Sequence, residues 1–496
     1  MSKPSTMSLP LKRALSRPSP PAVRWLAVAA GSTAILATYW DGAWHTEIGR
    51  DSTFAPPHIL LYASIALAAA VVVAWALFEI VAERSVWAVL RHRALVLSGI
   101  AVAAIGSSAV LDVLWHVYFG RDSVLWSPPH LLGIIGTVVL VVGFVMSRDR
   151  GRPLRVVDGA LCAVLLGTAM LPVMEFDSRV PQFAEGLYLP VVVVAALAAA
   201  WVIDVAVVGA RVITAIIAGV VLFRTAIWAV LSFSGWPTVD VPFALLALVL
   251  LDLRGLGRID RFSLAAMGMS GIQIVTSAVG LSSVELQPIL PAALVVIAGA
   301  GLVMLAARRR GRVSTALVMV ALVAGSMTVD AAPARAHDPG QGTDQGEVAM
   351  SVERAGTRVA VTAEVVSSRV PLRFERIVAR RAGQLIEATA DLPMENAAVT
   401  ATLELDDGDI WFIYAEYSSA LGPLESWITV EPDESRSDVR PLYEPPVSPV
   451  NDLEFIGASV ALYVLMMWLV WFALRVVNAS RRSPTERVHA VAAESS

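Results

Sequence analysis

The stretch Asp41-Gly-Ala-Trp-His-Thr-Glu-Ile-Gly-Arg-Asp-Ser-Thr-Phe-Ala-Pro-Pro-His58 occurs in this chain in two copies. The second copy is Asp112-Val-Leu-Trp-His-Val-Tyr-Phe-Gly-Arg-Asp-Ser-Val-Leu-Trp-Ser-Pro-Pro-His130, with one extra residue just before its prolines. Ten residues recur in the same order, and four of the seven histidines of the chain lie in the two copies. Polar residues that repeat at matched spacing in an apolar chain indicate a duplicated helical hairpin that carries a polar site.

The composition is that of a polytopic membrane protein. The chain has 496 residues, of which 56% are hydrophobic and 16% charged, and its mean hydropathy is +0.67. A soluble protein of this length would not be so apolar. The single cysteine, Cys162, excludes disulfides within the chain, cysteine-based zinc sites and thiolate copper sites. The chain has no basic domain, so we expect no nucleic-acid partner.

We predict a mainly α fold, a membrane helical bundle of about twelve segments. Most are long enough to cross about 30 Å of hydrocarbon at about 1.5 Å per residue. They lie at residues 22–44, 58–82, 94–118, 130–147, 157–175, 188–208, 212–233, 240–253, 262–282, 288–306, 314–332 and 453–475. The segment at 240–253 is short, so it is expected to tilt inward or to thin the bilayer locally.

These segments divide the chain into regions of different character. Residues 1–22 are rich in Ser and Pro and are predicted to form a disordered cytoplasmic tail. The regions that follow are 23–149 with the two hairpins, 150–313 with further membrane helices, 314–336, 337–448, the last membrane helix at 449–477, and a cytoplasmic tail at 478–496.

Arginine is concentrated in alternate loops, such as Arg148–Arg155 and Arg308–Arg312. By the positive-inside rule those loops are cytoplasmic, and so are both chain ends. The chain is then a multi-pass protein of the inner membrane, with both repeat loops on its outer face.

Residues 337–448 alternate apolar and polar residues between turn signals, which predicts five to seven short strands in an extracytoplasmic antiparallel β-sandwich. The segment before it, 314–336, is either a membrane helix or an internal signal-like segment. Its basic start and its Ala-Arg-Ala336 end match a secretory signal. Cleavage after Ala336 would make His337 a free N-terminus whose amine and imidazole could bind a metal.

The repeat has the residues of a metal site. Asp41 and His45 are four residues apart at a helix end and share one face. His58 opens the next helix behind two prolines, so folding of the hairpin brings it back to the pair. Asp112, His116 and His130 repeat the arrangement. Two imidazoles and a carboxylate without a thiolate suit copper, iron(II) or zinc.

Other repeated residues have supporting roles in this hypothesis. The pairs Arg50-Asp51 and Arg121-Asp122 are candidates for orienting the ligands. Trp44 and Trp115 fit an aromatic belt at the membrane interface. An alternative is that the duplicated residues serve only packing at helix ends near the lipid headgroups.

Several ionisable residues lie in or near other apolar segments. Asp204 and Arg224 fall in successive helices and could pair, because an ionisable group within the membrane needs a partner. A proton or ion path is the functional alternative. Glu175 and Asp177, at a helix end, are expected to be solvated loop residues.

Asp41-x3-His45-x12-His58, with Arg50-Asp51 and Phe54-x-Pro56 in its loop, resembles the metal-binding helix-loop-helix of the C subunit of the copper membrane monooxygenases. This family comprises the particulate methane and ammonia monooxygenases. The resemblance implies that Asp41, His45 and His58 bind copper. The second copy matches less closely and would contribute the ligands Asp112, His116 and His130.

The C-terminal part resembles the B subunit of the same enzymes in architecture, with a signal-like helix, a β domain and a membrane anchor. It departs from that subunit in lacking the His-x-His pair, because the β region has no histidine beyond His337.

Three hypotheses follow from the sequence. The first is a copper protein that oxidises a small apolar substrate with dioxygen. The second is a membrane protein that handles or transports copper or zinc without catalysis. The third is a structural membrane subunit. The expected partners are a metal ion, membrane lipid, and other membrane subunits or a second copy of this chain.

Overall fold

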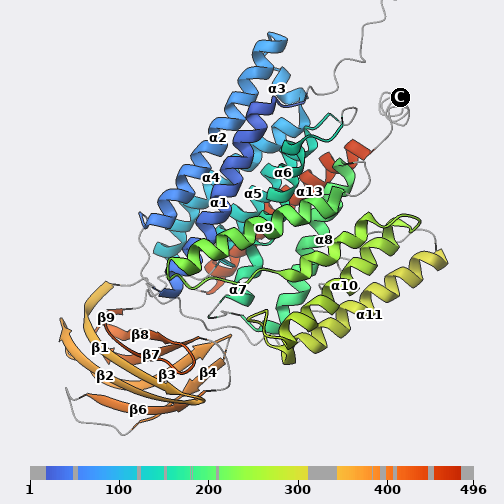
Figure 1. The fold of residues 1–496 in the computed structure, drawn as a ribbon. Coiled ribbons are helices and arrows are strands. Elements are labelled where there is room, and N and C mark those ends of the chain that lie inside the picture. Colours follow the sequence, from blue (N-terminus) through green and yellow to red (C-terminus); the bar gives the residue numbers. More distant parts are fainter. Residues whose placement is uncertain are drawn as a thin grey trace, which may run out of the picture.

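The structure is a computed structural model, in which a bundle of helices carries a β domain at one end (Figure 1). It describes residues 18–47, 54–119, 125–149, 153–178, 180, 183–207, 212–310, 343–382, 384–390, 398–405, 410–444 and 452–481. The mainly helical fold with a separate antiparallel β domain is the one that the sequence predicts.

Two helical hairpins carry the repeats. The first consists of α1 (Pro21–Glu47) and α2 (Pro56–Glu83), and the second of α4 (Arg93–Phe119) and α5 (Pro128–Met146), with the short α3 (Ala88–Arg91) between them. Both α2 and α5 begin at a proline pair, because a helix makes no use of the N–H groups of its first turn. The prolines therefore fix the point at which the following histidine emerges.

Glycines let α5 lie close to α4. A β-carbon at Gly136 would lie 2.8 Å from Ile105 Cγ1, and one at Gly143 would collide with Ser98 Oγ. Small residues at a helix interface are how membrane helices gain close packing. This contact fixes the second hairpin, and with it the relative positions of Asp112 and His130.

A proline break shapes the next segment. The predicted helix at 157–175 is not continuous: α6 (Val156–Ala169) is followed by the 3-10 turn η2 (Leu171–Val173) and the short α7 (Met174–Asp177). Pro172 lies in the turn, and a proline there cannot continue the helical hydrogen bonds. The chain therefore changes direction at the end of the bundle that carries the repeats.

The remaining helices complete the bundle. They are η3 (Glu185–Leu187), α8 (Tyr188–Ala206), α9 (Val212–Phe233), η4 (Phe243–Asp252), α10 (Arg258–Ala278), α11 (Leu286–Arg310) and, after the β domain, α13 (Asp452–Arg481). The helix α13 packs along α5 and α4.

Nine helices within the described residues are long and apolar enough to cross a membrane, which makes the chain a multi-pass membrane protein. The predicted segment at 240–253 forms only the short apolar η4, and the one at 262–282 forms α10, which is not among the nine. The segment at 314–332 lies outside the described residues.

The predicted pairing of Asp204 with Arg224 is wrong. Asp204 Oδ2 lies 2.6 Å from Arg258 Nη2, because α10 packs against α8. The Arg224 guanidinium lies 3.8 Å from the centre of the Tyr39 ring and donates a hydrogen bond to the Val239 carbonyl. Asp204 and Arg224 thus each pair with residues that are close in space, and neither partner lies on the next helix in the sequence.

The described strands of the β domain pair antiparallel in one sheet, in the order β4-β3-β7-β8-β9-β1-β2-β6-β5. They are β1 (Thr343–Ala355), β2 (Arg358–Ser368), β3 (Arg373–Arg381), β4 (Gln384–Glu387), β5 (Thr389–Ala390), β6 (Val399–Glu404), β7 (Trp411–Ser419), β8 (Gly422–Val430) and β9 (Ser435–Glu444). The sheet curls until β3 and β4 contact β6, so it is nearly closed. Its two ends therefore face each other across one core, and the described strands form one sheet.

The strand β7 is buried on both faces. Trp411 and Ile413 point into the core of the curled sheet, while Phe412 and Tyr414 belong to a second apolar cluster that includes Val180 of the helical part. Side chains alternate between the faces of a strand, so one strand can serve both clusters. The outer face of β7 is thus the surface on which the β domain meets the bundle.

Candidate metal centre

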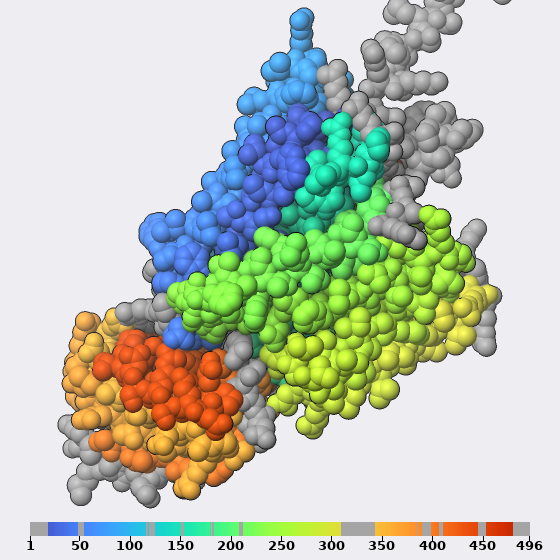
Figure 2. Space-filling view, viewed as in Figure 1, coloured from blue at the N-terminus to red at the C-terminus, as the bar shows by residue number. Residues whose placement is uncertain are grey.

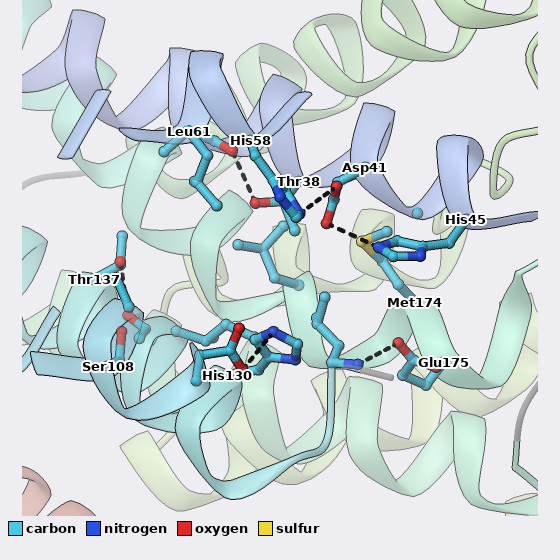
Figure 3. Close-up of a pocket in the computed structure, with 18 of the residues that line it drawn as sticks. Thr38, Asp41, His45, His58, Leu61, Ser108, His130, Thr137, Met174 and Glu175 are labelled. Atoms are coloured by element: carbon cyan, nitrogen blue, oxygen red, sulfur yellow. Dashed lines mark hydrogen bonds and ion pairs between the residues drawn. The ribbon is translucent and has the colours of Figure 1, made fainter. Parts of the chain in front are cut away.

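Asp41, His45 and His58 come together at the end of the first hairpin (Figure 3). One ligand atom from each lies within 4.8 Å of the other two. His58 Nε2 is 3.1 Å from Asp41 Oδ1, and His45 Nε2 is 3.8 Å from Asp41 Oδ2. The convergence of these three groups was predicted from their spacing. All three side chains are partly buried, and their donor set is one that copper, zinc or iron(II) accepts.

The second hairpin repeats part of this geometry. His130 Nε2 lies 3.1 Å from Asp112 Oδ1, the same separation as between His58 and Asp41. The side chain of His116 lies outside the described part of the chain, as do Arg50, Asp51, Arg121, Asp122 and His337. The roles predicted for those residues therefore stay predictions.

The two clusters line one cavity of about 210 Å³, which we call the repeat cavity. The sequence predicted two separate sites, whereas in the structure both open on a common cavity. The apolar part of its wall includes Ile65, Ile105, Ile134 and Leu171, and its small polar groups include Thr38, Ser108 and Thr137. The cavity can thus hold a small apolar molecule beside the Asp–His groups.

The turn after α6 closes the repeat cavity on a third side. Met174 and Glu175 line it, although neither belongs to the repeat. We expected Glu175 and Asp177 to be solvated, which is wrong: Asp177 is buried and Glu175 faces the cavity. One signal in the sequence was overlooked: Pro172 ends the membrane helix early and turns these residues inward.

The second copy of the repeat departs from the first at Leu125-Trp126. Both residues contact the turn after α6, which forms the third side of the cavity. The backbone N–H of Leu125 donates to Glu175 Oε1 at 2.8 Å, and Trp126 Nε1 donates to the Pro172 carbonyl at 2.8 Å. The Trp126 ring also meets the Phe176 ring edge-on. This loop is therefore adapted to hold the turn after α6 against the cavity.

The tryptophans of the repeats pack within the protein. Trp44 stacks on Trp236 with ring centres 5.4 Å apart, and Trp115 is buried against Phe455 of α13. The burial of Trp115 replaces the membrane-interface role that we predicted for it. Each tryptophan instead joins its repeat to another part of the fold.

The β domain covers the end of the repeat cavity. Phe412 of β7 and Val180 line the cavity at that end. Among the described residues, two ion pairs join the domain to the bundle: Arg436 to Glu47 at 2.6 Å, and the buried Arg381 to Glu185 at 3.1 Å. Figure 2 shows the domain, in orange, lying against the end of the bundle. Since Glu47 follows His45 by two residues, the first cluster lies directly at this contact.

A buried carboxyl group lies in the same β region. Burial raises the pKa of Glu425 to about 7, although Arg380 and a hydrogen bond from the Tyr443 hydroxyl oppose this shift. Tyr443 belongs to the apolar cluster that contains Phe412. The charge of Glu425 is therefore coupled to the packing of the surface that meets the bundle.

Comparisons of the chain with family models, with curated proteins and with solved structures found no match. The resemblance to the copper membrane monooxygenases thus depends on the repeat residues and on the architecture of the C-terminal part.

Proposed function

We propose that this protein binds copper in the Asp41–His45–His58 cluster and is a distant relative of the copper membrane monooxygenases. The observation that supports this most is the meeting of two imidazoles and a carboxylate within 4.8 Å of one another. Asp112, His116 and His130 would hold a second ion across the repeat cavity. Zinc and iron are the alternative metals, because both accept the same donors.

The reaction that we propose is oxidation of a small apolar substrate by dioxygen. A bound copper ion would supply the redox chemistry. The residues of the chain would do the rest: three ligands leave positions open, and the apolar wall with Ile65, Ile105 and Ile134 would hold the substrate beside them. Phe412 would limit the entry of water from the β-domain side.

We further propose that the protein lies in the inner membrane with both chain ends in the cytoplasm. The arginine-rich segments follow α2, α5 and α11 in the sequence, whereas the two repeat segments follow α1 and α4. The positive-inside rule then supports an outer position for the repeat cavity and the β domain.

Metal analysis of the purified full-length protein tests the proposal. The wild type is expected to retain copper after dialysis, and the variant Asp41→Ala/His45→Ala/His58→Ala is expected to lose the ion of the first cluster. Asp252→Asn is the control, since this carboxylate bonds to Thr214 and does not line the cavity. Equal metal content in wild type and triple variant would remove the first cluster as a metal site, and with it the proposed function.

Oxygen consumption then separates catalysis from metal handling. Copper-loaded protein with a reductant and a small hydrocarbon is expected to consume dioxygen, and the triple variant is not. Absence of turnover in the fully loaded wild type would instead favour metal handling, which metal accumulation in cells with and without the protein would measure.

A further inference from the structure

Met174 lies in the repeat cavity beside the first cluster. Its side chain is buried and lines the same cavity as Asp41, His45 and His58. In Figure 3 it extends from the turn after α6 toward the Asp41–His45 ion pair. Among the described residues of the cavity wall, Met174 alone carries sulfur.

Gly42 makes room for this side chain. It lies between Asp41 and His45 in α1 and also lines the cavity. A β-carbon at Gly42 would lie 2.8 Å from Met174 Cε, closer than any real β-carbon approaches a neighbour. Glycine inside a helix costs about 0.5–1 kcal/mol relative to alanine. At this position it lets a methionine from another segment reach the turn that carries two candidate ligands.

The chemistry of the donor set indicates what the sulfur could do. Asp41, His45 and His58 supply two nitrogens and one oxygen, a set that does not distinguish copper from zinc. A thioether is a soft ligand that favours Cu(I). The only thiol of the chain cannot serve here, because Cys162 is buried in α6 and does not line the cavity.

We propose that Met174 is a fourth ligand of the first cluster when the metal is Cu(I), and that Gly42 gives its thioether access. This inference rests on the proposed copper binding. It makes the centre selective for reduced copper over zinc, a property that the Asp–His–His set alone does not give. The turn at Pro172 is then part of the metal centre, because it directs residue 174 inward.

Affinity measurements test this role. Full-length protein in detergent is titrated without oxygen with Cu(I) against a competing chelator, and in parallel with Zn(II). Met174→Leu, which keeps size and apolarity, is expected to weaken Cu(I) binding by at least about tenfold and to leave Zn(II) binding unchanged. Met170→Leu is the matched control, since this buried methionine lines a different cavity.

X-ray absorption of the Cu(I)-loaded protein gives an independent readout. The wild type is expected to show a sulfur neighbour of copper, and Met174→Leu none. Gly42→Ala is expected to remove the sulfur neighbour of copper as well, because its methyl group would displace the thioether. Gly99→Ala, whose β-carbon would meet nothing within 4 Å, is its control.

The outcomes distinguish the two proposals. A wild type that binds no copper overturns the proposed function itself. A wild type that binds Cu(I) without a sulfur neighbour, and as tightly as Met174→Leu, overturns only the role of Met174. Equal losses of Cu(I) and Zn(II) in Met174→Leu would also overturn that role, since they would show that the methionine only packs the site.

Discussion

Replacing Glu425 by Gln should abolish a pH dependence of the β domain. The pKa of Glu425 is raised by burial to about 7 from an ordinary 4.5, which corresponds to about 3 kcal/mol. Because the pKa of Glu425 is higher in the folded than in the unfolded protein, protonation of this carboxyl group stabilises the fold. This contribution is fully present below pH 4.5 and is lost as the pH rises to about 7.

Hydrogen–deuterium exchange of the full-length protein measures the effect locally. Peptides that cover β7 and β8 should lose up to about 100-fold in protection between pH 4.5 and 7.5, after correction for intrinsic exchange rates. Glu425→Gln keeps the hydrogen bond with the Tyr443 hydroxyl but cannot ionise, so its protection should be nearly independent of pH. The charges that face this carboxyl, Arg380 and Glu416, are left in place.

The exposed Glu364 of β2 provides the control, since Glu364→Gln should leave the wild-type pH dependence intact. If the wild type and Glu425→Gln lost protection in parallel as the pH rises, burial of this carboxyl would not be the cause. The prediction would then be refuted.

Two further predictions concern the packing that positions the second cluster. Gly143→Ala places a methyl group against Ser98 Oγ at the contact of α4 and α5 and should destabilise the protein by about 1–3 kcal/mol. A lower melting temperature in detergent than that of Gly99→Ala would confirm it, and equal values would count against the close contact. Trp126→Phe removes the hydrogen bond to the Pro172 carbonyl and should cost about 1 kcal/mol. Proteolysis of the 125–127 loop should become faster, and an unchanged rate would show that the bond does not hold the loop.

The sequence predicted the parts of the site that depend on local geometry. The spacing of Asp41 and His45 on one helix face, and the proline pair before His58, were enough to predict that the three groups meet, because short-range helix geometry decides both. The antiparallel β domain was likewise visible in alternating residues, whose period does not depend on the rest of the fold.

The parts that were missed depend on contacts between segments distant in sequence. The proline break at Pro172 was visible in the sequence, but only packing decides that Met174 and Glu175 then lie beside the repeats. Asp204 found Arg258 in a later helix, because packing and not sequence order decides which helices are neighbours. Phe412 could not be distinguished from the other apolar residues of the β region, because its role depends on the outer face of its strand covering the cavity.

The opening of both repeats on one cavity means that they cannot act independently. A proton or cation taken up by one hairpin therefore alters the free energy of uptake at the other, and thermodynamic linkage makes the effect reciprocal. If each hairpin binds a cation as proposed, the second positive charge would enter the shared cavity less readily than the first.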